Sequence, residues 1–346
     1  MPVETLDNIP RRPLPSAEAF RRQVVEHPDE PVIYTGAFEG QPMAALRTLE
    51  DFKRVLGDLP LEIKENYLEG TADLILRYSH GERPTTKFAK AMMTVSSYLD
   101  FIETNPNTTK MAADLTPPPE LAALYEVPPH FKLSETDPLY SVFFVSNKGN
   151  ASDFHSDWHG HYAVLFQCAG RKRVCLIPPR HSHKAVPVTY AGMISFRDFS
   201  GEDKLHYLRF AHAYDAVLNP GEMVFIPRMW QHHLEYIDTG MGVSFRFGAV
   251  SKYAQFCLTK LHRDAYVQNV ARIMLDTDKV EREYMHHFKA IEEAYERGPT
   301  PVEKYRAVRK VAREICEAVF GESFAPMIRL DAHDILEQQL SAFSYR

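Results

Sequence analysis

The feature that most constrains the fold is a series of short, β-rich apolar segments between residues 139 and 250. They cover residues 141–145, 162–168, 174–177, 223–226 and 242–247. Tight-turn signals such as Lys148-Gly149-Asn150 and Asn219-Pro220-Gly221 separate them. Closely spaced strands joined by tight turns predict an antiparallel barrel or sandwich.

Helical patterns flank this region on both sides. Upstream, Ser16 and Thr48 are each placed to cap a helix, and Thr48 is followed by Asp51 in the manner of a capping box. Downstream, apolar residues recur at helical spacing, as at positions 284, 288, 291 and 295. We therefore expect an N-terminal α/β flank packed on the barrel at residues 1–138, a barrel core at 139–250 and a C-terminal helical region at 251–346.

Composition and charge argue against several classes of protein. The formal net charge is -6 and no basic stripe stands out, so we do not expect nucleic acid as a partner. The start of the chain has no apolar segment of a secretory signal, and no run of 18 apolar residues exists, so we expect a cytoplasmic protein that does not enter a membrane. No two of the four cysteines form a CxxC pair, which favours a role as small core residues: Cys168, Cys175, Cys257 and Cys316.

A histidine-rich segment at residues 153–161 is the first candidate for chemistry. Residues two apart in a strand point to the same side, so His155 and Asp157 can aim at one point inside a barrel. The pair alone is a weak signal, because the chain holds 16 histidines. Further along, a turn and an apolar strand end at Pro227, and His232 stands at the start of the next strand, where it can face the pair across a barrel. Two imidazoles and one carboxylate on one face of an iron(II) ion leave three positions open.

These segments resemble the Jumonji-C and cupin-like 2-oxoglutarate oxygenases, in particular the group that contains the asparaginyl hydroxylase inhibiting hypoxia-inducible factor. His155-Ser156-Asp157 matches the metal motif, and Gly170-Arg171-Lys172 matches a Gly-x-Lys element. Residues 220–227 (PGEMVFIP), followed by Trp230 and His232, match the element with the distal histidine. The resemblance covers most of the chain and implies a double-stranded β-helix, the cupin or jelly-roll barrel.

The resemblance also implies roles for individual residues. His155, Asp157 and His232 would bind iron(II), and His232 is preferred over His233 because it stands five residues after Pro227. Lys172 would pair with the distal carboxylate of 2-oxoglutarate, and the hydroxyl of Ser152 would add a hydrogen bond. The implied activity is hydroxylation of an unactivated C–H bond of an amino-acid side chain in a peptide or protein, or of a small molecule derived from an amino acid. Dioxygen is consumed, and succinate and CO₂ are released.

The sequence departs from the family pattern at several positions around the cosubstrate. The stretch between Asp157 and Lys172 is two residues longer, and Ala163 stands where the family often has asparagine. The tyrosine usually supplied by an earlier strand has no clean match, and the equivalent stretch is 109–114. His161 or Arg246 could supply the missing polar contacts, and Arg246 could instead anchor a carboxylate of the substrate.

Two alternatives stay open at this stage. A cupin that binds another divalent metal without 2-oxoglutarate could use His159 and His161 as further ligands, although Lys172 argues against it. A non-catalytic interaction protein on the same scaffold is less compatible with an intact set of two histidines and one carboxylate. By resemblance, the apolar stripes of the C-terminal helices allow a homodimer, but packing against the barrel would produce the same pattern.

Overall fold

The computed structural model describes residues 3–27, 29–65, 90–134, 138–157, 159–185, 192, 194, 196–260 and 265–321. Strands β6 to β13 alternate along the chain between two sheets. The larger sheet holds β6 (Leu139–Ser146), β8 (Tyr162–Ala169), β11 (Glu222–Ile226) and β13 (Gly240–Phe247). The smaller sheet holds β7 (Ala151–His155), β9 (Lys172–Ile177), β10 (Tyr214–Leu218) and β12 (Gln231–Tyr236).

The order of the strands is that of a double-stranded β-helix. In the larger sheet it runs β11-β8-β13-β6, and in the smaller sheet β10-β9-β12-β7, with antiparallel pairing throughout these strands. Successive strands therefore cross from one sheet to the other, apart from the β9–β10 pair, and two Greek-key halves face each other. The predicted jelly-roll barrel is confirmed.

The N-terminal segment extends the larger sheet at both edges. β1 (Arg11–Pro13) and β2 (Val32–Thr35) join it beside β11, and β5 (Ala112–Leu115) joins it beside β6. β3 (Pro60–Lys64) and β4 (Lys90–Thr94) form a separate two-stranded sheet. The N-terminal flank is thus partly continuous with the barrel, because its strands share the barrel's hydrogen-bond ladder.

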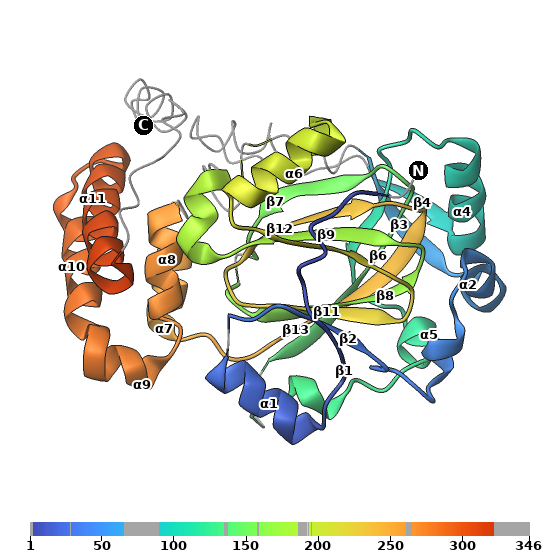
Figure 1. Ribbon diagram of the computed structural model, residues 1–346, viewed down its shortest axis with the longest axis horizontal. Coiled ribbons are helices and arrows are strands. Elements are labelled where there is room, and N and C mark those ends of the chain that lie inside the picture. Colours follow the sequence, from blue (N-terminus) through green and yellow to red (C-terminus); the bar gives the residue numbers. More distant parts are fainter. Residues whose placement is uncertain are drawn as a thin grey trace.

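The N-terminal helices pack on the outer face of the larger sheet. They are α1 (Ala17–Glu26), α2 (Leu49–Leu56), α4 (Val95–Thr104) and α5 (Pro119–Ala122). Ser16 caps α1, and Thr48 forms a capping box with Asp51 at α2, as predicted. Figure 1 shows α2, α4 and α5 at the end of the β-structure opposite the C-terminal helices. Short 3-10 helices occupy Pro42–Ala45, Pro129–Phe131, Pro179–Ala185 and Phe196–Asp198.

One helix covers the outer face of the smaller sheet. α6 (Gly201–Phe210) buries Tyr207 and Leu208 against Phe154 of β7, together with Phe196. Its amphipathic pattern is weak because Lys204 is among its buried residues. The sequence interpretation missed both this helix and the following strand β10.

The C-terminal helices form a layer at one end of the barrel (Figure 1). They are α7 (Lys252–Lys260), α8 (Ala265–Ile273), α9 (Thr277–Lys279), α10 (Met285–Arg297) and α11 (Pro301–Phe320), with a π-helical turn at Val280–Tyr284. The apolar stripe of α11 packs inside this layer, where Val308 and Ile315 are buried beside residues of α8 and α10. The stripe is accounted for within one chain, so it gives the predicted homodimer no support.

The space between the two sheets is filled at one side only. Leu165, Val174, Leu176 and Val224 form a small apolar core with Trp230. Towards β6, β7 and β12 the same space opens into a cavity of about 400 Å³. The larger apolar core lies on the other face of the larger sheet, beneath the N-terminal helices. The barrel therefore holds a cavity between its own two sheets.

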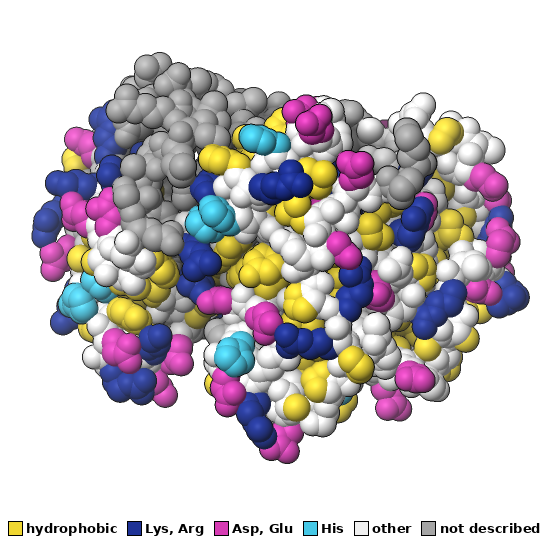
Figure 2. Space-filling view, viewed as in Figure 1, with side chains coloured by type: hydrophobic (Ala, Val, Ile, Leu, Met, Phe, Trp, Pro, Cys, Tyr) yellow, Lys and Arg dark blue, Asp and Glu magenta, His cyan; other side chains and the backbone are white. Residues whose placement is uncertain are grey.

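The remaining expectations concern cysteines, membranes and surface charge. All four cysteines are free and buried, as predicted. None of the described helices is both long and apolar enough to cross a membrane. On the face drawn in Figure 2, basic and acidic side chains of the described residues are interspersed, without a continuous region of one sign.

Candidate functional site

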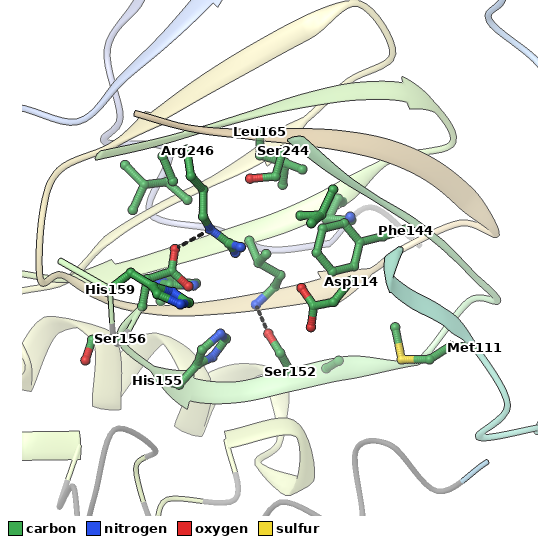
Figure 3. A pocket seen from close by; sticks show the side chains of 18 of the residues that line it. Met111, Asp114, Phe144, Ser152, His155, Ser156, His159, Leu165, Ser244 and Arg246 are labelled. Carbon is green, nitrogen blue, oxygen red and sulfur yellow. Dashed lines mark hydrogen bonds and ion pairs between the residues drawn. The ribbon is translucent and has the colours of Figure 1, made fainter. Parts of the chain in front are cut away.

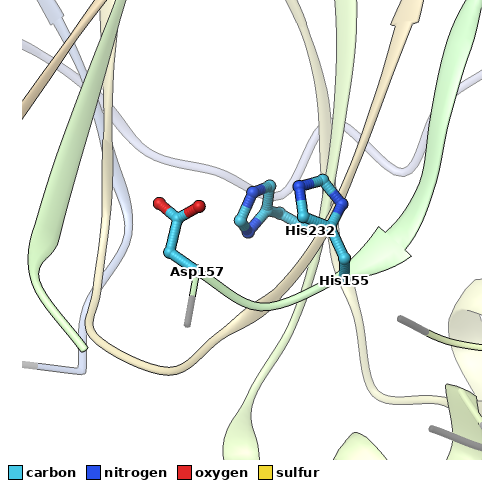
Figure 4. A group of neighbouring side chains, drawn as sticks. All are labelled: His155, Asp157 and His232. Carbon is cyan, nitrogen blue, oxygen red and sulfur yellow. The ribbon is translucent and has the colours of Figure 1, made fainter. Parts of the chain in front are cut away.

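Three side chains converge at the cavity, as the sequence motif predicted. His155 is the last residue of β7, and His232 stands opposite it in the β7–β12 pair. Their ring centroids are 4.1 Å apart. One ligand atom from each of His155, Asp157 and His232 lies within 4.8 Å of the others (Figure 4). In the part of the chain that the structure describes, no other group of His, Cys, Asp or Glu side chains meets this geometry.

The backbone reaches this arrangement in a different way from the one expected. An extended strand through both residues was predicted to point His155 and Asp157 to the same side, but β7 ends at His155. Asp157 follows in a turn, where its carbonyl accepts a hydrogen bond from the amide of Gly160 (3.2 Å). Gly160 has a φ of 70°, which glycine adopts at little cost. This prediction of a continuous strand was wrong; Trp158 lies outside the described residues.

Backbone carbonyls orient both histidines. The Nδ1–H of His155 donates to the carbonyl of Asp153 (2.8 Å), and the Nδ1–H of His232 donates to the carbonyl of Trp230 (3.1 Å). A carbonyl can only accept, so each Nδ1 carries a proton, and Nε2 is the ring nitrogen that is left to bind a metal. Burial, and then the charge of His155, lower the pKa of His232 to about 3. His232 is therefore neutral near pH 7, which is the form that binds a metal.

Arg246 holds the carboxylate of the group. Its Nε donates to Oδ2 of Asp157 (2.8 Å), and both side chains are half-buried. Burial acts to raise the pKa of Asp157, but the neighbouring groups, above all the charge of Arg246, lower it, so the pKa lies below its ordinary value. Asp157 is thus ionised, with one oxygen bound to the guanidinium. Two imidazoles and one carboxylate are a donor set suited to iron(II).

Lys172 brings a buried amine into the same cavity. It is the first residue of β9 and only 1% exposed. Its Nζ lies 4.1 Å from the ring centroid of Tyr236 and 5.9 Å from that of Phe144. Burial lowers the pKa of Lys172 to about 7. A buried cation without a compensating anion is costly, so the amine marks a place for a negatively charged group.

Of the other residues predicted to contact the cosubstrate, some line the cavity and one does not. Ser152 lines it, and its Oγ accepts a hydrogen bond from the amide of Leu234 (3.2 Å). Ala163 and Arg246 also line it. His161 is not among the lining residues, and its Nδ1 lies 2.7 Å from the carbonyl of Gly248. His161 is therefore left out of the function proposed below.

Sequence interpretation missed three features of the cavity. These are the Arg246–Asp157 ion pair, the ring of Tyr236 against Lys172, and the carboxylate of Asp114 in the cavity wall. Arg246 and Asp157 lie 89 residues apart, so no local pattern links them. Asp114 belongs to the stretch 109–114 that stands in place of the family's tyrosine, and that departure was its only signal in the sequence.

The comparisons with known proteins agree with the fold. The model of the Cupin-like domain family matches residues 16–252. The match takes in the N-terminal flank from residue 16 onward, strands β2 to β13 and all three residues of the candidate metal group. This chain belongs to the Cupin-like domain family, and the Jumonji-C and cupin-like resemblance is confirmed.

The curated relatives are distant. Lysine-specific demethylase 8 of Xenopus tropicalis is 25% identical over 258 residues, which cover 70% of this chain and 54% of the relative. tRNA wybutosine-synthesizing protein 4 of Neurospora crassa is 28% identical over 65% of this chain and 19% of the relative. tRNA wybutosine-synthesizing protein 5 of Danio rerio is 33% identical over 36% of this chain and 37% of the relative. The chain thus matches about half or less of the length of these relatives.

Proposed function

We propose that this protein is an iron(II)- and 2-oxoglutarate-dependent oxygenase. One observation carries the proposal: the metal-type group His155, Asp157 and His232 opens into the same cavity as the buried amine of Lys172. A metal site alone would suit many reactions. A metal site that shares a cavity with a buried cation suits a cosubstrate with one end on the metal and an anionic group at the other end.

The residues present fit this assignment. His155 and His232 would bind the metal through Nε2, since backbone carbonyls occupy both Nδ1 atoms. Asp157 would bind through the oxygen that Arg246 leaves free. Lys172 would neutralise the distal carboxylate of 2-oxoglutarate, with Ser152 as a polar neighbour in the cavity wall. When bound, iron(II), 2-oxoglutarate and dioxygen supply the oxidising power for a C–H bond, with succinate and CO₂ as products.

The protein's own contribution is orientation and exclusion of water. Val142, Leu165 and Ile226 give the cavity an apolar wall, which limits the water that reaches the reacting groups. The ligands are fixed by strand pairing and by backbone hydrogen bonds, so little reorganisation is needed when a metal binds. We expect hydroxylation as the outcome.

The substrate class is proposed from the cavity and the charge of the chain. The names of the relatives include both a lysine demethylase and tRNA-modifying proteins. The net charge of -6 gives a polyanionic nucleic acid no electrostatic support. We therefore propose an amino-acid side chain in a peptide or protein, or a small molecule derived from an amino acid.

The proposal is tested by ordered binding to the metal-free protein. Mn²⁺, which does not start turnover, is titrated into the metal-free protein first. 2-Oxoglutarate is then titrated into the Mn²⁺-loaded protein, and calorimetry measures both binding steps. We expect one Mn²⁺ per chain and a 2-oxoglutarate affinity that depends on the metal. Binding of Mn²⁺ without any binding of 2-oxoglutarate would favour a cupin that uses another metal chemistry. Binding of neither would contradict the oxygenase assignment.

A further inference from the structure

The C-terminal layer reaches the barrel beside the distal histidine of the metal group. In Figure 1, α7 and α8 lie on the side of that layer nearest the barrel, and α10 and α11 lie farther out. Figure 3 shows His155 extending from β7 into the cavity, and His232 stands opposite it on β12. Met229 and Gln231, which precede His232, both contact the layer. The layer and the metal group therefore meet at the start of β12.

The two residues that flank Trp230 are held by these helices. Met229 is 2% exposed and packs in the same apolar cluster as Tyr253 of α7. Its φ of 64° lies in the left-handed region, which residues other than glycine seldom adopt unless their surroundings hold them there. Gln231 is fully buried, and its Nε2 donates to Oε1 of Gln268 in α8 (3.0 Å). The backbone on both sides of Trp230 is therefore anchored to the C-terminal layer as well as to the sheet.

The carbonyl of Trp230, between these two anchors, orients the candidate metal-binding ring. It accepts the Nδ1–H of His232 at 3.1 Å, so the position of this carbonyl sets the direction in which Nε2 points. Adjacent residues of a strand point to opposite sides, so Gln231 reaches α8 while His232 faces the cavity. Gln268 is not among the residues that line the cavity. Any effect of Gln268 on a bound metal must therefore pass through β12.

We propose that Gln268 is a positioning residue for the metal site, and that it acts through Gln231 and the carbonyl of Trp230 on the ring of His232. This inference rests on the metal group of the proposed function and adds helix α8 to that site. α8 lies beyond residue 252, where the family match ends, so the positioning contact comes from outside the matched region. Loss of a partner that orients a metal-binding histidine typically weakens metal binding by about 10- to 100-fold.

Gln268 and its neighbour Asn269 provide a matched pair of variants. Both are buried and both bond α8 to the barrel, but Asn269 donates to the carbonyl of Pro179 (2.6 Å), in the turn after β9. Gln268→Met and Asn269→Leu are both expected to lower the unfolding temperature of the metal-free protein, because each removes a buried hydrogen bond. Only Gln268→Met is expected to weaken Co²⁺ binding, by about tenfold, and to change the visible absorption of the bound ion. Unchanged Co²⁺ affinity in Gln268→Met, or an equal loss in Asn269→Leu, would overturn the inference.

A second measurement uses the wild type and so does not depend on the folding of any variant. Coupling between two sites is reciprocal, so a metal that binds better when α8 holds β12 must in turn stabilise that contact. Amide hydrogen exchange, measured by mass spectrometry, is expected to slow in α8 when Mn²⁺ binds, and to slow less in α1, which packs on the larger sheet. Equal exchange in α8 with and without bound Mn²⁺ would overturn the inference. A wild type that binds neither Mn²⁺ nor Co²⁺ would instead refute the proposed function.

Discussion

At the scale of single residues, the candidate metal group depends on which face of β12 each histidine occupies. His232 faces the cavity, whereas its neighbour His233 packs against Phe154 and Phe196 on the other face of the sheet. Adjacent residues of a strand point to opposite sides, so only one of the two can reach the metal position. The proposed choice of His232 is therefore open to a direct test by mutation.

We expect His232→Ala to weaken Co²⁺ binding by at least about 100-fold, because the loss of one of three ligands leaves a carboxylate and a single imidazole. His233→Leu is the matched control, and it should bind Co²⁺ like the wild type. The absorbance of protein-bound Co²⁺ during titration of the metal-free protein measures both affinities. Loss of binding in His233→Leu with retention in His232→Ala would show that the wrong histidine had been chosen.

Lys172 gives a second prediction, in which stability and cosubstrate binding change in opposite directions. Each unit by which folding depresses a pKa costs about 1.4 kcal/mol, and the pKa of Lys172 falls from its ordinary value of 10.5 to about 7. We expect Lys172→Met to unfold at a higher temperature than the wild type at pH 7 and to bind 2-oxoglutarate about 10- to 100-fold more weakly. Differential scanning calorimetry and titration calorimetry check the two parts. A less stable variant with unchanged affinity would contradict both.

The same lysine sets the pH dependence of the wild type. Between pH 7 and 10.5 the unfolded chain binds the lysine proton and the folded protein does not, so the contribution of Lys172 to stability rises with pH across this window. The anion requires the protonated amine, so the affinity for 2-oxoglutarate should fall above pH 7 by about tenfold per pH unit. Affinities measured from pH 6 to 9 test this. An affinity that is constant over this range would exclude Lys172 as the partner of the carboxylate.

At the scale of the elements, a buried ion pair joins the smaller sheet to the start of the chain. Arg173 of β9 donates from Nε and Nη2 to Asp215 of β10, both at 2.9 Å, and Asp215 also accepts from the amide of Leu6 (2.9 Å). The side chains are 3% and 0% exposed. Removal of one partner leaves a buried charge without compensation, which is more costly than the loss of an exposed pair.

We therefore expect Asp215→Ala to lower the free energy of unfolding by about 3–5 kcal/mol. The control is Asp238→Ala, which removes the partner of Arg171 in an ion pair whose side chains are 47% and 41% exposed. That change should cost less than about 1 kcal/mol. Urea denaturation of the two variants measures the difference. Similar losses in both would show that burial does not determine the strength of the pair.

Elements with a regular local pattern could be predicted from the sequence, and those that depend on tertiary contacts could not. The strands around Leu165 and Val224, and the caps Ser16 and Thr48, follow from apolar runs and capping residues. Helix α6 was missed because its buried Lys204 disrupts the amphipathic pattern. Strand β10 was missed because burial of Asp215 depends on an ion pair formed across strands.

The candidate site likewise contains features that local sequence patterns predict and features that depend on tertiary contacts. The convergence of the two histidines and Asp157 could be predicted because their motifs carry local turn and strand signals. The ion pair of Arg246 with Asp157 could not, because it depends on the position of β13 relative to the turn after β7. The entry of Asp114 into the cavity depends on a register shift that leaves no mark in the sequence.

At the scale of the whole molecule, metal and cosubstrate should stabilise the barrel together. The candidate ligands come from β7, the turn after it and β12, and Lys172 comes from β9, so binding depends on an intact smaller sheet. A ligand that binds only the folded state stabilises it by about 2.7 kcal/mol when the ligand concentration is about 100 times the dissociation constant. We expect Mn²⁺ with 2-oxoglutarate to raise the unfolding temperature more than Mn²⁺ alone, as measured by differential scanning fluorimetry. No added shift with 2-oxoglutarate would contradict a shared site.

The most direct test of the central claim is the visible spectrum of the metal-free protein mixed anaerobically with iron(II) and 2-oxoglutarate. The account predicts a weak charge-transfer band that requires both components and is absent in His232→Ala and in Lys172→Met. A protein that binds iron(II) stoichiometrically but develops no such band with 2-oxoglutarate would contradict it.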